Sequence, residues 1–204
     1  MEQVLSGFQA MSGWEYVAAI LSLAYVVLAM FQTIWCWPAA FVSTLIYTLL
    51  FWQGKLVMES VLNFYYLIMA VYGFYQWRNG KRAKSEQLKI QSWSVSAHIK
   101  IIAITFAVAM VLGYISGTYF DAKLAYLDAF TTAFAVMTTY MVTQKVLENW
   151  LYWIVIDIAS IYMYIQLGYF PTVVLFVLYT LIAYMGYRNW RTDFRLQPTQ
   201  YSPA

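Results

Sequence analysis

The most unusual chemical group in this sequence is a carboxylate in the middle of an apolar stretch. The segment Lys145 to Gln166 is apolar enough to cross a bilayer, yet it carries Asp157 near its centre. A charged side chain at membrane depth is costly, so it usually faces inward and serves a function. A helix would place this acid on one stripe with two aromatic rings and a hydroxyl. The stripe consists of Trp153, Asp157, Ser160 and Tyr164. Such a set could hold a flat, polar or cationic ligand.

A second polar group lies in the apolar stretch Met58 to Trp77. Glu59, Asn63 and Tyr66 would share one helix face there. Glu59 lies about one turn inside the expected boundary, so its carboxylate can equally reach water and be structurally neutral. The Asn63 amide is deeper and needs hydrogen-bond partners, which either a neighbouring helix or a ligand would supply.

The composition identifies the environment of these groups. The chain has 204 residues, of which 63% are hydrophobic, 20% aromatic and only 10% charged. This balance indicates an integral membrane protein. The net charge of +3 does not indicate a nucleic-acid partner, because the basic residues cluster between apolar segments. With a single cysteine, Cys36, and a single histidine, His98, we expect neither disulfides nor a metal or other cofactor.

The apolar segments predict an all-α protein with seven transmembrane helices, because each is long enough to cross the hydrocarbon layer. They are Trp14–Gln32, Thr33–Gln53, Met58–Trp77, His98–Tyr119, Leu124–Gln144, Leu147–Gly168 and Phe170–Arg188. The first thirteen residues lack the basic region and cleavage site of a removable signal peptide. We therefore expect the first helix to remain in the mature protein.

The distribution of positive charge predicts the orientation in the membrane. Basic residues gather in the link Arg78–Ala97 and in the tail that follows Arg188. The loops on the other side hold only Lys55 and Lys123. Because cytoplasmic loops carry an excess of lysine and arginine, the amino terminus should lie outside and the carboxyl terminus inside.

The chain also resembles itself at a constant offset of 113 residues. Matching pairs at this offset include Trp37 and Trp150, Gln53 and Gln166, Tyr66 and Tyr179, Gly73 and Gly186, and Trp77 and Trp190. We interpret this as two three-helix units, residues 14–77 and 124–190, joined by a single helix, residues 98–119. One intervening helix makes the two units parallel, a plan found in transporters whose substrate site lies between the repeats.

The two units differ at the polar positions where an asymmetric ligand would require a difference. At the same offset Asp157 corresponds to Thr44, Glu59 to Thr172 and Asn63 to Phe176. The residues predicted to bind substrate are Thr44, Glu59, Asn63, Tyr66, Trp153, Asp157 and Tyr164.

Another cluster stands at the start of the sixth segment, with Lys145, Glu148, Asn149 and Trp150. Its acid suits the amino-terminal end of a helix and could form a local ion pair with Lys145, unless the cluster also acts as a gate. The chain lacks a Walker loop, a zinc-type histidine cluster and a nucleophile with a base, so we expect that the protein is not an enzyme.

The run KVLENWLYWIVIDIASI, from Lys145 to Ile161, and the run YGFYQW, from Tyr72 to Trp77, resemble the PnuC family of bacterial vitamin transporters. The resemblance covers nearly the whole chain, and the pattern K-x-x-E-N-W-x-x-W is its most specific part. It implies a three-plus-one-plus-three fold similar to that of SWEET sugar transporters. It also implies facilitated diffusion across the bacterial inner membrane, trapping of the vitamin by an intracellular kinase, and a homotrimer.

Family substrates include nicotinamide riboside, thiamine and riboflavin. Nicotinamide riboside transporters of the family carry asparagine where this chain has Asp157, and they lack an acid at the position of Glu59. The resemblance therefore favours thiamine, as in the PnuT branch, because carboxylates suit its cation and its aminopyrimidine. Nicotinamide riboside, also cationic, is the alternative. Two further hypotheses are a proton-coupled carrier with Asp157 as relay and a membrane scaffold that binds no vitamin.

Overall fold

The computed structural model describes residues 12–55, 57–79, 88–120 and 123–197, and these residues form seven helices. The helices are α2 (Gly13–Met30), α3 (Cys36–Gln53), α4 (Val57–Asn79), α5 (Val95–Tyr119), α6 (Ala125–Thr143), α7 (Asn149–Leu167) and α8 (Phe170–Leu196). The prediction of an all-helical chain is confirmed. Each helix occupies one predicted segment, although α8 continues past Arg188 to Leu196. The basic residues Lys81, Arg82 and Lys84 lie outside the described residues.

By length and composition, α2, α5, α7 and α8 are apolar enough to cross a membrane. The other three helices, α3, α4 and α6, are of similar length and carry several hydroxyl and amide groups, as the threonines of α6 illustrate. Some of those groups bond within the helix itself; for example, the Thr139 hydroxyl donates to the Ala135 carbonyl oxygen at 2.8 Å. Such back-bonding lets a helix carry threonine without leaving a polar group unpaired.

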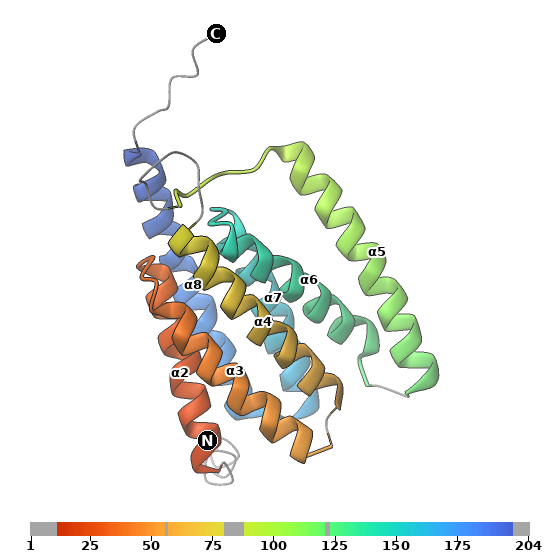
Figure 1. Ribbon diagram of the computed structural model, residues 1–204. Helices are drawn as coiled ribbons and strands as arrows, with labels where there is room; N and C mark the ends of the chain where they lie inside the picture. Colours follow the sequence, from red (N-terminus) through yellow and green to blue (C-terminus); the bar gives the residue numbers. More distant parts are fainter. Residues whose placement is uncertain (1–11, 56, 80–87, 121–122, 198–204) are drawn as a thin grey trace.

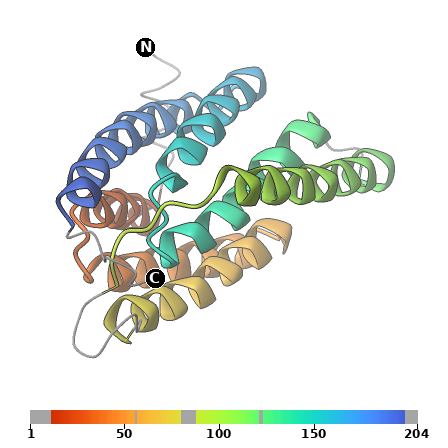
Figure 2. The same ribbon diagram turned by 90° about the horizontal axis from the view of Figure 1, so that it is seen from above.

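The helices form two groups of three with one helix at the edge. In the first group α3 packs against α2 and α4, and in the second α7 packs against α6 and α8. The groups meet where α2 contacts α8 and where α4 contacts α6. The remaining helix, α5, lies at the periphery and packs against α6 (Figures 1 and 2). We call the group of α2, α3 and α4 the first half (residues 12–79). We call the group of α6, α7 and α8 the second half (residues 123–197).

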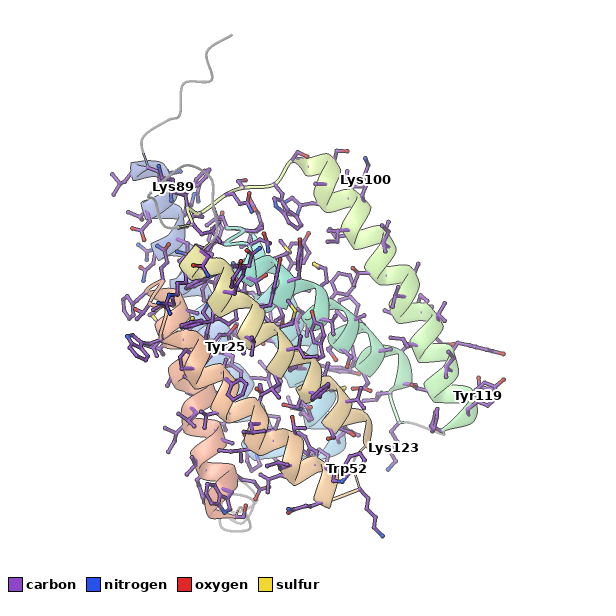
Figure 3. The ribbon with its side chains drawn as sticks, in the orientation of Figure 1. Tyr25, Trp52, Lys89, Lys100, Tyr119 and Lys123 are labelled. Atoms are coloured by element: carbon purple, nitrogen blue, oxygen red, sulfur yellow. The ribbon has the colours of Figure 1, made fainter. Side chains whose placement is uncertain are left out.

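The α2–α3 turn and the α6–α7 turn lie at the same end of the bundle, together with the last turns of α8 (Figure 1). We call this the turn end. Lys89 and Lys100 also lie there, whereas Trp52 and Lys123 lie at the opposite end (Figure 3). The two turns have the same backbone form, because Gln32 and Lys145 have left-handed φ values of 55° and 51°. These residues are 113 positions apart.

The core at the turn end is built from tryptophans that pack against glycines. Trp37 lies over Gly73 in the first half, where an added Cβ would come within 2.3 Å of the ring. Trp150 lies over Gly186 in the same way, at 2.8 Å. Trp37 also meets Trp77 edge to face at 5.3 Å and 88°, and Trp150 meets Trp190 at 5.4 Å and 87°. Only glycine allows this close approach of ring and helix.

Candidate functional site

Asp157 lies in the middle of α7 on the face that the helix buries. Its side chain is 2% exposed, and the other buried residues of α7, such as Trp150, Ser160 and Met163, follow the same helical period. Within the part of the chain that the structure describes, no side chain forms an ion pair or a hydrogen bond with the Asp157 carboxylate. Burying an ion costs several kcal/mol without such partners. A cation that binds here would therefore gain a full electrostatic partner.

One tyrosine from another helix lies near Asp157, and two more lie beyond it. Tyr179 of α8 lies within electrostatic reach of Asp157. Tyr25 of α2 lies within reach of both Tyr179 and Tyr66 of α4. All three rings stay partly accessible although they lie deep in the bundle, and Tyr25 stands between the two ends in Figure 3. We call Asp157 with these three residues the central tyrosine site. It brings together both halves of the chain.

An aromatic path leads from this site toward the opposite end. Tyr66 lies near Tyr164, whose ring stacks on Phe176 with centroids 5.4 Å apart and an interplanar angle of 24°. Tyr164 in turn lies within reach of Glu59 and Asp128. Both acids are exposed. Tyr66 and Tyr164 are therefore connected to Asp157 through a series of neighbouring tyrosines. Glu59 lies at the end of this series that is farthest from Asp157.

The other residues predicted to bind substrate have structural partners of their own. The Asn63 amide nitrogen donates to the Glu59 carbonyl oxygen at 2.9 Å, one turn earlier in α4. The Thr44 hydroxyl donates to the Ala40 carbonyl oxygen at 2.8 Å. Trp153 is half-buried and packs against both apolar clusters of the core. A role for these residues in binding stays a prediction.

Lys145 lies at the turn end and reaches from the second half toward the first. Its ammonium donates to Gln32 Oε1 at 3.2 Å and lies 4.5 Å from the centre of the Trp77 ring. Gln32 Nε2 donates to Asp193 Oδ2 at 2.6 Å, which places a carboxylate behind the amide. Lys145 is only 5% exposed. Burial lowers its pKa from 10.5 to about 8, and the nearby Cys36 thiol and Asp193 oppose this shift.

The expected ion pair between Lys145 and Glu148 is wrong. The Glu148 carboxylate accepts hydrogen bonds from the Ser92 hydroxyl and, at 3.4 Å, from the Trp93 backbone N–H. It also lies 3.7 Å from His98 Nε2. The left-handed turn at Lys145 directs its side chain into the bundle, while Glu148 faces the segment that precedes α5. Glu148 thus fastens that segment to the second half.

Asn149 and Trp150, the remaining residues of the predicted signature, are buried at the start of α7. Asn149 Nδ2 donates to the Val146 carbonyl oxygen at 2.6 Å and so supports the α6–α7 turn. Trp150 packs on Gly186. Among the described residues, no three His, Cys, Asp or Glu side chains gather as metal ligands.

Sequence reasoning missed Tyr25, Tyr179 and Gln32. Tyr179 carried a signal, because it matches Tyr66 at the offset of 113 residues, whereas Gln32 corresponds to Lys145, a residue of another type. Tyr25 had no such signal: its counterpart at this offset is Thr138, a residue of another type. Thr138 is fully buried, and its hydroxyl has no partner among the described residues.

Comparison with known proteins shows which proteins this chain is similar to. The family model for the nicotinamide mononucleotide transporter matches residues 12–192. The riboflavin/roseoflavin transporter RibM of Streptomyces davaonensis is 24% identical over 86% of this chain and 83% of its own length. The nicotinamide riboside transporter PnuC of Escherichia coli is 21% identical over 93% of this chain and 90% of its own length.

A solved structure agrees with the fold. The crystal structure of the vitamin B3 transporter PnuC superposes with a TM-score of 0.75 and 24% identity, covering 94% of this chain and 86% of that one. The likeness in fold and the family match over nearly the whole chain support the same conclusion. The chain belongs to the nicotinamide mononucleotide transporter family, the PnuC family of multi-pass membrane vitamin transporters.

Proposed function

We propose that this protein carries nicotinamide riboside across the bacterial inner membrane by facilitated diffusion. The observation that carries the proposal is the buried, unpaired carboxylate of Asp157 near Tyr179, with Tyr25 and Tyr66 beyond that ring. The nicotinamide ring of the riboside is a flat cation. A carboxylate neutralises such a charge, and tyrosine faces favour both its flat surface and its positive charge.

The named relatives support the same class of ligand. Two are named for nicotinamide riboside and riboflavin, compounds in which a flat ring carries a sugar or a sugar-like chain. In the central tyrosine site, the phenol hydroxyls would be available to bond the ribose. Net uptake would come from phosphorylation of the vitamin inside the cell, as the family resemblance implies.

We further propose a three-plus-one-plus-three plan with seven membrane crossings. The two left-handed turns and the two tryptophan–glycine contacts, each pair 113 residues apart, support two equivalent units with residues 98–119 between them. The basic residues Lys100, Arg188 and Arg191 at the turn end support a cytoplasmic position for that end. The family resemblance supports assembly as a trimer.

Thiamine is the second candidate, because this chain has acids at Asp157 and Glu59. The two carboxylates lie at different depths. Glu59 precedes Tyr66 by roughly 10 Å of helix, and it acts on Asp128 and Tyr164. Thiamine would have to span this distance to use both acids at once, whereas nicotinamide riboside needs only Asp157.

Calorimetric titration of the detergent-purified protein with each vitamin tests the proposal. We expect nicotinamide riboside to bind the wild-type protein and Asp157→Leu, which removes the carboxylate and leaves no polar group in its place, to weaken that binding by at least about tenfold, because a charge-assisted contact is lost. Melting temperature is the control for folding, since removing an unpaired buried charge should not destabilise the fold. Binding of thiamine alone, weakened by Glu59→Gln, would replace the first candidate with the second. No binding of either vitamin would overturn the proposal.

Vesicle uptake separates facilitated diffusion from proton coupling. Vesicles that contain the protein should equilibrate labelled nicotinamide riboside without accumulating it, with or without an imposed pH gradient. Accumulation driven by the gradient would instead assign Asp157 to a proton relay.

A further inference from the structure

The hydrogen bonds that the structure describes between the two halves gather at the turn end. The Trp77 indole donates to the Val142 carbonyl oxygen at 3.3 Å, and the Gln144 amide donates to the Tyr72 hydroxyl at 3.1 Å. The Trp190 indole donates to the Ala29 carbonyl oxygen at 3.1 Å. A further bond, from the Tyr65 hydroxyl to the Val136 carbonyl oxygen, lies at mid-depth. The two halves are therefore tied together mainly at one end.

The opposite end has a different character. There Glu59 of the first half and Asp128 of the second half interact as acids of like charge. Like charges oppose close approach of the two halves. In this conformation hydrogen bonds hold the two halves together at the turn end, whereas two exposed acids, one from each half, lie near each other at the opposite end.

Aromatic rings fill the closed end. Trp77 lies between Trp37 and Trp190, with ring centroids 5.3 Å and 6.1 Å away, and Trp190 continues to Trp150 at 5.4 Å. All four tryptophans are almost fully buried. Asp157 follows Trp150 by only about 10 Å of helix. A ligand that leaves the central tyrosine site toward this end must therefore pass these rings.

One contact at this end joins equivalent points of the two halves. Gln32 and Lys145 occupy the same left-handed position in their turns and bond directly to each other. The contact consists of one hydrogen bond to a neutral amide and one ring face. Breaking it returns a buried ammonium to water, which offsets part of the loss. It is therefore suited to repeated opening.

We propose that Gln32 and Lys145 are a latch that closes the turn end, and that each transport cycle requires the latch to open. The inference rests on the proposed transport function and identifies Lys145 as a positioning residue for it. Lys145 controls the exit by holding the two turns together and does not touch the ligand in the central tyrosine site.

Cross-linking tests the latch directly. In a Cys36→Ala background, which removes the single native cysteine, Gln32→Cys and Lys145→Cys are joined with a short bis-methanethiosulfonate that dithiothreitol cleaves. We expect the cross-link to lower vesicle uptake of labelled nicotinamide riboside by at least about tenfold, because the exit step is blocked. Calorimetric binding of the riboside should persist, and dithiothreitol should restore uptake.

A matched control joins two residues that do not span the halves. His98 Nδ1 and the Tyr152 hydroxyl lie 2.9 Å apart and connect α5 to α7. A cross-link between His98→Cys and Tyr152→Cys should leave uptake unchanged. If the cross-linked latch variant transports as fast as its cleaved form, the latch is overturned while the transport function stands. If the Cys36→Ala parent neither binds nor transports the riboside, the proposed function fails instead.

Native Cys36 provides a test that needs neither a transported substrate nor introduced cysteines. Its thiol is fully buried and lies within electrostatic reach of Lys145. We expect Gln32→Leu to speed labelling of Cys36 by N-ethylmaleimide several-fold, because the turn end opens more often while the Lys145 ammonium, which favours the reactive thiolate, stays in place. Lys100→Met, a change at an exposed lysine of the same end, should not. Equal labelling of wild type and Gln32→Leu would overturn the latch.

Discussion

Trp77 and Trp190 make the same hydrogen bond in opposite directions between the two halves of the protein. The Trp77 indole donates to the Val142 carbonyl oxygen, and the Trp190 indole donates to the Ala29 carbonyl oxygen. The two donors are related by the offset of 113 residues, and so are the two acceptors. The contact within this single chain thus has the reciprocity of a two-fold symmetric dimer interface.

Removing either indole should have a similar cost. We expect Trp77→Phe and Trp190→Phe each to lower the free energy of unfolding by roughly 1–3 kcal/mol, because each removes a buried hydrogen bond and part of a packed ring. The Val142 and Ala29 carbonyl oxygens still accept the backbone N–H of Lys145 and of Gln32. Thermal unfolding in detergent measures the effect, with Trp52→Phe as the control, since Trp52 is 66% exposed. A loss confined to one of the two variants would show that the reciprocal geometry has no equal energetic counterpart.

A methyl group on either packed glycine should disturb its tryptophan. We expect Gly73→Ala and Gly186→Ala to destabilise the protein by about 1–3 kcal/mol through overpacking. Gly73→Ala should cost more, because its added Cβ would lie 2.3 Å from the Trp37 ring, whereas the Cβ added in Gly186→Ala would lie 2.8 Å from the Trp150 ring.

The control for this pair is Gly117→Ala in α5. Its added Cβ would meet Ala125 at an ordinary 3.5 Å, so the better helix propensity of alanine should give a slight gain in melting temperature. A melting temperature unchanged by Gly73→Ala would mean that the Trp37 ring has room to move.

Stability should depend on pH through Lys145. Burial lowers its pKa from 10.5 to about 8, so between these pH values the unfolded chain holds a proton that the folded chain has lost. The free energy of unfolding should then rise with pH across this window, by at most about 3 kcal/mol. Melting curves at several pH values measure this rise. Lys145→Met should abolish it, and Lys100→Met should retain it; an equal rise in both variants would exclude Lys145 as its source.

Glu148 should control the order of the segment before α5. We expect Glu148→Ala to speed hydrogen exchange at the Trp93 amide, which donates to the Glu148 carboxylate. The neighbouring bond from the Leu147 N–H to the Gln91 carbonyl oxygen, 2.8 Å long, is independent of that carboxylate and serves as the internal control. Exchange at Trp93 that matches the wild type would assign its protection to the backbone alone.

The helices and the offset between the halves could be predicted from sequence, because both depend on local patterns. Twenty-residue apolar segments must be helical inside a bilayer. Repeated Trp and Gly residues reveal equivalent packing when their spacing is constant, as with Trp37 and Trp150. Asp157 stood out for a related reason, since a charge within an apolar segment violates the expected pattern.

The partners of the polar residues could not be predicted in this way. Glu148 pairs with residues more than fifty positions away, where no periodic pattern reaches. Gln32 and Lys145 are related by the offset but differ in type, so a comparison of identical residues passes over them. Glu59 and Asp157 share a charge and an apolar setting, yet only the helix positions show that they lie at different depths.

The packing of Trp37 on Gly73 also bears on how the chain is made. Both residues belong to the first half, and their contact involves no helix that follows α4. The first three helices can therefore assemble as soon as they leave the ribosome, before α5 has been synthesised. Trp150 and Gly186 make the equivalent contact within the second half. During synthesis, the two three-helix units can therefore fold one after the other.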